Sequence, residues 1–415
     1  MQRIFEGRTK SWKSLDYVAG WFMKAADYGL HTPTVSAFVS TNSICQGQQV
    51  PILWPLIFKT GHEIAFAHTS FKWANLASHN AGVTVAIVAI SNHAGVTRKL
   101  FTLAEDGGAV VKEADNINAY LVTAPTIIVE SISRSPTDRG YMVWGNKPTD
   151  DGNLVVSSDE RKELISTHPS ADAFIRRYYG AAEFIRGLER YCIWIEDDER
   201  ALADEIQPIR ERIQRVREFR AKSKAAETRP AAAFPHRFRQ IQSVAKRVSY
   251  IVPQVSSENR EYLPIGLLPE RSIVSNLAFA LYDAPLWNMA LIASRLHLVW
   301  IATVCGKLET RYRYSNTLGW NTFPVPQLTE KNKADLTRCA EDILLAREAH
   351  FPATIADLYE VKDGESKMPE NLRAAHDRND EVLERIYIGR RFRNDTERLE
   401  KLFEMYTKMT VKGAA

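Results

Sequence analysis

The segment from Gly306 to Pro326, GKLETRYRYSNTLGWNTFPVP, opens with charged and aromatic residues in alternation. On an extended strand, Glu309, Arg311 and Arg313 would share one side and the intervening tyrosines the other. Side chains two residues apart on a strand are separated by about 6.6 Å, close to two base-pair steps of roughly 3.4 Å. Arginine pairs with guanine O6 and N7, and glutamate accepts from cytosine N4. The spacing is compatible with contacts to successive base pairs, whereas the residues taken alone favour an ion-paired strand facing solvent.

Sequence motifs of common catalytic chemistry are absent. There is no G-x-x-x-x-G-K-[ST], no G-x-G-x-x-G after a strand and no G-x-S-x-G. His62-Glu63 resembles the start of a zinc-binding H-E-x-x-H, but the next histidine is His68, six residues beyond the first. On a strand these imidazoles would lie about 20 Å apart, too far for one metal ion. The carboxylates form no evident acid-base pair, so we predict no metal site and no catalytic constellation in this chain.

Length and composition describe an ordinary globular protein. A chain of 415 residues favours two or three domains. With 45% hydrophobic and 25% charged residues, it is neither disordered nor membrane-embedded, and no apolar run is long enough to span a bilayer. The net charge of +4 is compatible with a nucleic-acid partner without indicating one. The four scattered cysteines predict reduced, buried thiols, and the lack of a signal sequence predicts a cytoplasmic protein.

Hydrophobic periodicity predicts an α/β region at the start of the chain. The strands expected there are apolar on both faces and separated by helices, which indicates a sheet buried between layers. A domain of this class needs three or four more strands, so we interpret residues 1–95 as the second half of a domain. The expected elements are a helix over 15–28, strands over 36–41, 63–67 and 83–90, and an apolar helix or loop over 53–58.

The rest of the chain is predicted to be mixed and then helical. Residues 196–226 are expected to form one long charged helix, which ends before an Ala/Pro-rich break. Its arginines suit a solvated face, with contact to phosphates as the alternative. Short strands and turns are expected to surround an apolar helix over 285–301, and the remainder is predicted to be helical.

Several segments resemble one family. LDYVAGWFMKAADYG, SAFVSTNSICQGQQVPILWPLIF, EIAFAHTSFKWAN and VTVAIVAIS, all within residues 15–91, are similar to the second half of an adenine-N6 DNA methyltransferase of the MmeI-like (type IIL) restriction-modification family. The similarity continues through VSSENREYLPIG, LYDAPLW, YSNTLGWNTFPVP, AHDRNDEVLERIY and ERLEKLFEMY, so that it covers nearly the whole chain. The resemblance implies a partial Rossmann-like α/β methyltransferase half over 1–98, an α+β target-recognition domain over 99–326 and an all-α C-terminal domain over 327–415.

Two motifs of this family are missing. The Asn-Pro-Pro-Tyr/Phe motif, which holds the amino group of the target adenine, is absent, as is the Gly-rich turn that binds S-adenosylmethionine. The resemblance implies that the complete enzyme uses S-adenosylmethionine and double-stranded DNA, and that this chain alone binds no cofactor and carries no catalytic residue. An upstream-encoded chain is expected to supply the missing half. The alternative is a non-catalytic specificity subunit or a truncated remnant that still binds DNA.

The resemblance also assigns residues. Phe71 and Trp73 match the segment that lines the pocket for a flipped base, with packing at a sheet edge as the alternative. Asn42 and Gln46 lie in a turn that either faces this pocket or caps a helix. By position, the residues that match the family's sequence-reading sites are Gln254, Asn276, Leu277, Glu309, Arg311 and Arg313. Trp320 and Phe323 are expected to anchor the end of the recognition domain in its core.

Overall fold

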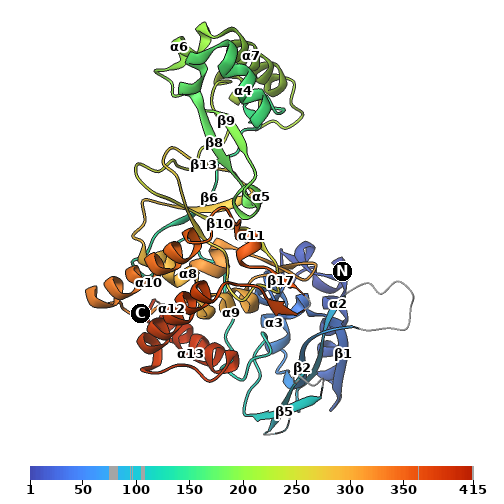
Figure 1. Ribbon diagram of the computed structural model, residues 1–415. Helices are drawn as coiled ribbons and strands as arrows, with labels where there is room; N and C mark the ends of the chain where they lie inside the picture. Colours follow the sequence, from blue (N-terminus) through green and yellow to red (C-terminus); the bar gives the residue numbers. More distant parts are fainter. Residues whose placement is uncertain (74–82, 94, 96, 104–107, 363, 414–415) are drawn as a thin grey trace.

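The computed structural model describes residues 1–73, 83–93, 95, 97–103, 108–362 and 364–413. Figure 1 shows a sheet with flanking helices at the N-terminal side, a central body, a lobe that projects from this body, and a group of C-terminal helices beside the body. None of the helices in the described residues is long and apolar enough to cross a membrane.

The N-terminal region is a five-stranded mixed sheet in the order β1-β3-β2-β4-β5. Strand β3 is antiparallel to both β1 and β2, whereas β2 and β4 are parallel. Helix α3 connects β1 to β2, and with α2 it covers one face of the sheet, where Phe22 packs on Phe38 at 4.7 Å between ring centroids. The elements are α1 Gln2–Phe5, α2 Tyr17–Gly29, β1 Val35–Thr41, α3 Gln49–Phe58, β2 Glu63–Lys72, β3 Thr84–Ser91, β4 Arg98–Leu103 and β5 Ala109–Ala114.

The predicted combination of a sheet with helices is confirmed, but the expected burial of the sheet between layers is wrong for its outer strands, because β1 and β5 are largely exposed. One strand also differs in length. Strand β2 was expected to end at residue 67 and instead continues to Lys72. A register shift between His68 and Phe71 marks a bulge in its pairing with β3, within the part of the strand that was not expected.

The central body contains a four-stranded sheet in the order β12-β10-β14-β6 and a three-stranded sheet in the order β11-β16-β15. The apolar helix expected over 285–301 is two helices, because Ser294 adopts an extended backbone and caps the second one by accepting from the His297 amide. The elements are β6 Met142–Trp144, β10 Ser249–Pro253, β11 Val255–Ser256, β12 Gly266–Leu268, β14 Ala278–Tyr282, α8 Trp287–Ile292, α9 Arg295–Val304, β15 Lys307–Leu308 and β16 Arg311–Arg313.

The projecting lobe has a sheet in the order β13-β8-β9-β7 and its own apolar core. The prediction of a single charged helix over 196–226 is wrong. Two helices are separated at Ile206, whose backbone is extended, because Pro208 lacks an amide proton and is tolerated only in the first turn of a helix. The elements are β7 Val155–Ser157, α4 Ser158–Thr167, β8 Ile175–Tyr179, α5 Ala181–Arg186, β9 Arg190–Ile193, α6 Arg200–Glu205, α7 Gln207–Ala221 and β13 Ile273–Val274.

The C-terminal region is predominantly helical, as predicted, with one small hairpin. Asn394 caps the last helix by accepting from the Glu397 amide at 2.9 Å. The elements are α10 Glu330–Glu348, α11 Ile355–Leu358, β17 Val361–Lys362, β18 Glu365–Ser366, α12 Glu370–Ile388 and α13 Asp395–Gly413.

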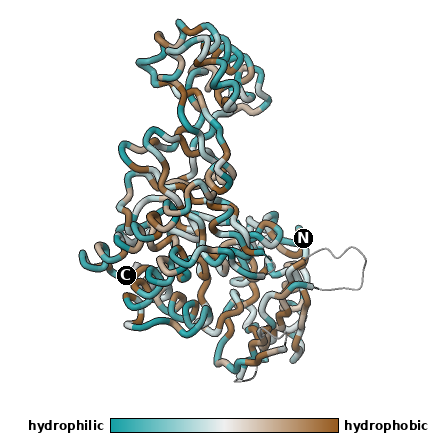
Figure 2. Tube along the Cα trace, viewed as in Figure 1, coloured by the Kyte–Doolittle hydropathy of each residue, from teal (hydrophilic) through white to brown (hydrophobic). Residues whose placement is uncertain are grey.

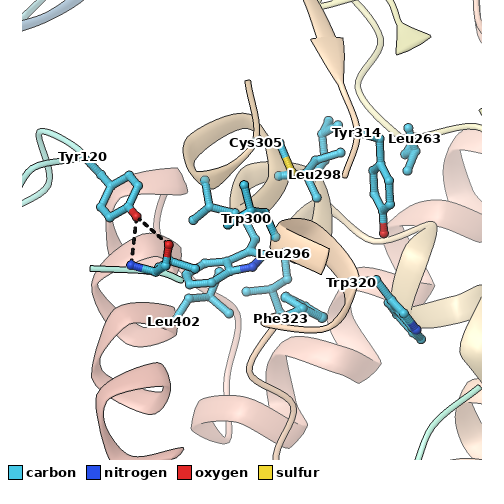
Figure 3. Close-up of a cluster of buried hydrophobic side chains, with 14 of the residues drawn as sticks. Tyr120, Leu263, Leu296, Leu298, Trp300, Cys305, Tyr314, Trp320, Phe323 and Leu402 are labelled. Atoms are coloured by element: carbon cyan, nitrogen blue, oxygen red, sulfur yellow. Dashed lines mark hydrogen bonds between the residues drawn. The ribbon is translucent and has the colours of Figure 1, made fainter. Parts of the chain in front are cut away.

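One large apolar core joins these regions, apart from the lobe. Its members come from the N-terminal sheet, the central body and the C-terminal helices. Trp300 of α9 lies near its centre, fully buried, with its ring 5.3 Å from that of Phe403 in α13 (Figure 3). Trp320 and Phe323 are completely buried, as expected, and all four cysteines are buried and unpaired. Figure 2 shows apolar residues along the strands of the N-terminal sheet and in the middle of the body.

The lobe is held by a buried guanidinium. Arg220 of α7 is completely buried, and its three nitrogens donate to the backbone carbonyls of Thr149, Ala231, Phe234, Pro148 and Arg237 at 2.8 to 3.1 Å. Five donors in a fixed planar arrangement are available only from arginine. Arg220 therefore ties the end of α7 to two loops of the lobe.

We predict that Arg220→Met destabilises the lobe by about 3 kcal/mol, because five buried carbonyls lose their donors. Arg217→Met, at an exposed position on the same helix, serves as the control and should change stability little. Urea denaturation followed by hydrogen exchange in α4 and α7 measures the difference. Equal stability of the two variants would show that Arg220 does not hold the lobe together.

Candidate nucleic-acid interface

Strands β15 and β16 form a hairpin with a two-residue turn at Glu309 and Thr310, since Leu308 pairs with Arg311. Arg311 and Arg313 lie on β16 with exposed side chains, as expected. The expectation for Glu309 is wrong in one respect: it occupies the turn instead of a strand, with a positive φ of 58°. The tight turn reverses the chain there, and this brings the Glu309 carboxylate 2.9 Å from the Arg311 guanidinium.

The opposite side of the hairpin enters the core. Tyr314 is buried, its hydroxyl lies 2.9 Å from Nε2 of His297, and its amide donates to the carbonyl of Gln254 at 2.8 Å. Burial lowers the pKa of His297 to about 3, so this imidazole is neutral at physiological pH. Burial likewise raises the pKa of the Tyr314 hydroxyl, which stays protonated. The neutral pair fixes Tyr314 inward, and the alternation of the strand then directs Arg313 outward.

Strand register brings the other predicted reading residues to the same end of the body. Val255 pairs with Arg313, which sets Gln254 beside β16, and Pro253 pairs with Ala278, which sets Gln254 beside Leu277. Leu277 is 56% exposed and Asn276 is partly exposed in the turn between β13 and β14. Register therefore places Gln254 between Leu277 and the C-terminal end of β16, where Arg313 lies, whereas Glu309 occupies the turn at the other end of this strand.

A cleft separates this hairpin from the N-terminal sheet. Its volume is about 600 Å³, and both regions contribute to its walls. Gln46 faces it from the turn after β1, and its Oε1 has no hydrogen-bond partner among the residues that the structure describes. Asn42 donates to Oγ of Ser70 in β2 at 3.2 Å. This contact is neither the helix cap nor the base-pocket position that was considered for Asn42. The lining residues are Asp16, Thr41, Asn42, Ser43, Gln46, Gly47, Gln48, Gln49, Val83, Thr84, Gly306, Lys307 and Glu309.

Two glycines allow the two walls of the cleft to meet. Gly47 has a positive φ of 57°, and a Cβ added there would lie 3.1 Å from both the Cα and the nitrogen of Gly306, directly before the hairpin. The backbone contact thus fixes the distance between the N-terminal sheet and β15. Sequence analysis did not identify this contact, although a glycine within CQGQQ and another before an alternating strand are signals of a tight turn or a close approach.

Phe71 and Trp73 lie together, with 6.3 Å between ring centroids. Phe71 was expected beyond the strand and is instead part of β2, where it pairs with Val85. Trp73 is 41% exposed, and its amide donates to the carbonyl of Val83 at 2.8 Å. Neither side chain lines the cleft, whereas Val83 and Thr84 of the neighbouring strand do.

The arginines of α7 are used largely within the lobe. Arg212 forms an ion pair with Glu160 at 2.6 Å, and Arg215 donates to the side chain of Asn153 at 2.8 Å. These contacts favour the interpretation of α7 as a structural, solvated helix over a phosphate-binding one. Within the described residues, no group of three or more histidine, cysteine or acidic side chains is arranged to hold a metal ion.

The chain thus consists of an α/β sheet joined through one core to a body with an exposed basic hairpin and then to a helical region. Three domain families match the chain: the MmeI DNA-methyltransferase domain over residues 1–102, the MmeI target recognition domain over 123–327 and the MmeI C-terminal domain over 328–412. The chain belongs to the MmeI-like family of type IIL restriction-modification proteins, which confirms the resemblance seen in the sequence.

Two relatives show how much of such a protein the chain represents. DNA methyltransferase A of Bacillus subtilis (strain 168) is 38% identical over 410 residues, which are 99% of this chain and 45% of that protein. The type IIL restriction-modification enzyme MmeI, whose structure was solved in complex with DNA, is 36% identical with a TM-score of 0.85, and the match covers 99% of this chain and 54% of that one. The chain therefore spans about half the length of these relatives.

We predict that Gly47→Ala disturbs the contact between the sheet and the hairpin. The substitution should destabilise the protein by about 2 kcal/mol, because the strain of a positive φ adds to a clash with backbone. Gly61→Ala is the control, since Gly61 has a φ of 79° and no atom near its added Cβ. It carries the strain without the clash and should lose only about 1 kcal/mol. Chemical denaturation of both variants checks the prediction, and equal losses would contradict it.

Proposed function

We propose that this chain supplies sequence-specific DNA recognition as the C-terminal portion of an S-adenosylmethionine-dependent adenine-N6 DNA methyltransferase of a restriction-modification system. The observation that carries the proposal is the exposed strand β16: Arg313 lies near Gln254, Arg311 projects two residues away on the same strand, and Tyr314 is anchored in the core. The DNA-bound state of the MmeI relative supports double-stranded DNA as the partner.

The geometry of the hairpin suits contacts to base edges. Arg311 and Arg313 project from alternate positions of one strand, about 6.6 Å apart along it, which matches two base-pair steps. Guanidinium groups donate to guanine O6 and N7, and the Glu309 carboxylate accepts from cytosine N4. The ion pair between Glu309 and Arg311 is exposed, with 75% and 45% of the side chains accessible. Such a pair contributes at most about 1 kcal/mol, so that it opens readily when bases offer better partners.

In this proposal the N-terminal region helps to bind the target base once it is flipped out of the duplex. A methyltransferase that modifies a base must flip it out of the duplex and stack it against aromatic groups. The neighbouring rings of Phe71 and Trp73 suit this role, and the amide-rich cleft between the sheet and the hairpin suits the adjoining nucleotides. Gln46 Oε1, an acceptor that no described residue satisfies, is available there to an amino group of the DNA.

A second candidate is a non-catalytic specificity module, either a separate subunit or a truncated remnant. It is favoured by one observation: Tyr314 and His297 anchor the hairpin in the core that the N-terminal sheet, the body and the C-terminal helices share. Binding of a specific duplex by this chain alone supports both candidates. Methyl transfer to adenine after the complementary half is added distinguishes the first from the second.

We predict that Arg311→Ala lowers discrimination at one base pair of the recognised site by about 1–3 kcal/mol. The site is first selected from a randomised duplex library with the wild-type chain, and variant binding is then measured against every single substitution of that site. Arg313→Ala should relax a different base pair, and Arg217→Ala, on the lobe, should leave the preference unchanged. An unaltered preference of the Arg311 variant would remove this residue from sequence recognition.

We further predict that the chain alone does not bind S-adenosylmethionine, because the Gly-rich turn of the family is absent from its sequence. Isothermal titration calorimetry of the full chain should give no binding heat at micromolar concentrations. The complex with the complementary methyltransferase half should bind the cofactor. Micromolar binding by the isolated chain would place a cofactor site within residues 1–415 and contradict the proposed division of labour.

A further inference from the structure

The outward face of the hairpin carries aliphatic residues beside its arginines. Leu308 of β15 pairs with Arg311 of β16, and Val255 of β11 pairs with Arg313, so that each arginine has an aliphatic neighbour directly across from it. Side chains that face each other on paired antiparallel strands point to the same side and lie about 5 Å apart. The outward face therefore presents two arginines and two aliphatic side chains in one patch.

Leu308 does not serve to fill the interior. It is 42% exposed, and within the described part of the chain it is not among the apolar residues that form the large core or pack against it. Tyr312, on the opposite face of β16 from Arg311, does pack against this core. A single exposed leucine is common on protein surfaces. The position of Leu308 directly across from Arg311, more than its exposure, therefore points to a role in binding.

A two-stranded ribbon such as β15–β16 has the size of the groove in which bases are read. The major groove of B-DNA is about 12 Å wide and admits two strands, and neighbouring strands lie about 4.8 Å apart. When Arg311 contacts a guanine, Leu308 on the second strand reaches an adjacent base pair, since successive pairs are about 3.4 Å apart. The apolar group that distinguishes bases in this groove is the C5-methyl group of thymine.

We propose that Leu308 is a further specificity-determining residue, which packs on the C5-methyl group of a thymine in a base pair adjacent to the one that Arg311 reads. The inference rests on the proposed function. The leucine side chain has no donor or acceptor, so it does not compete with Arg311 for the guanine edge. Its contact with a methyl group removes apolar surface of both the protein and the DNA from water. Uracil, which differs from thymine only by this methyl group, isolates the contact.

The test compares thymine with uracil at one position of the duplex that the wild-type chain selects. Arg311→Ala first identifies the base pair that Arg311 reads, and a thymine is expected in one strand of an adjacent pair. Replacing this thymine by deoxyuridine should weaken binding of the wild-type chain about fourfold, which is the effect of losing one buried methyl group. Leu308→Ala should bind the thymine and uracil duplexes equally.

Leu267→Ala is the matched control. Leu267 lies on β12, outside the hairpin, and is 43% exposed, close to the value for Leu308. This variant should keep the fourfold preference for thymine, and a control that also loses the preference would contradict a local contact by Leu308. Thermal unfolding of both variants confirms that the fold is retained.

Three further results would overturn the inference. These are a selected site without a thymine adjacent to a pair that Arg311 reads, a wild-type chain that binds the thymine and uracil duplexes equally, and a Leu308→Ala variant that keeps the full preference for thymine. Each of them leaves the selection of a DNA site by the wild-type chain intact and contradicts only this inference. A wild-type chain that selects no duplex contradicts the proposed function and, with it, the role of Leu308.

Discussion

The hydroxyl of Tyr314 and Nε2 of His297 lie 2.9 Å apart inside a core that excludes water, and the exposed hairpin depends on this contact. Because successive side chains of a strand point to opposite faces, Arg313 faces outward when Tyr314 faces inward. The Tyr314 amide also bonds to the Gln254 carbonyl, so the same residue sets the neighbouring segment. Burial keeps His297 neutral by lowering its pKa to about 3, and the pair therefore brings no charge into the core. One buried hydrogen bond thus organises several exposed side chains.

The lobe has its own apolar core, whereas the other regions of the molecule share a single core. Residues of the N-terminal sheet, the body and the C-terminal helices share one core, so the cleft between sheet and hairpin has walls that belong to a single packed unit. The lobe has a separate core, and the buried Arg220 secures it with bonds to backbone carbonyls of the lobe and its connections. Local unfolding of the lobe is therefore compatible with an intact hairpin.

Sequence patterns predicted elements where a periodic apolar face or an alternating strand was present. The helix at the start, the strands of the N-terminal sheet, the buried Trp320 and Phe323 and the strand with Arg311 and Arg313 follow from such patterns. Patterns were insufficient where one residue changes the backbone. Pro208 separates two helices that share a charged composition, and Ser294 separates two that share an apolar one. The turn at Glu309 depends on pairing between Leu308 and Arg311, which no single-strand pattern contains.

The residues of the candidate site could be predicted from the sequence, but their arrangement could not. The residues that converge on the hairpin were identified through family resemblance, but their proximity follows from register, which sets Gln254 between β16 and the turn at Leu277. The cleft and the contact of Gly47 with Gly306 depend on the meeting of two segments about 260 positions apart in the chain.

The solvent exposure of the turn at Glu309 has a consequence for which substitutions the hairpin tolerates. Side chains that are largely accessible, as those of Glu309 and Arg311 are, contribute little to folding, so that replacing them changes stability by only about 0.5 kcal/mol. The tyrosine that holds the hairpin is a separate residue, with its own place in the interior. Substitutions of the outward residues are therefore compatible with an unchanged hairpin scaffold.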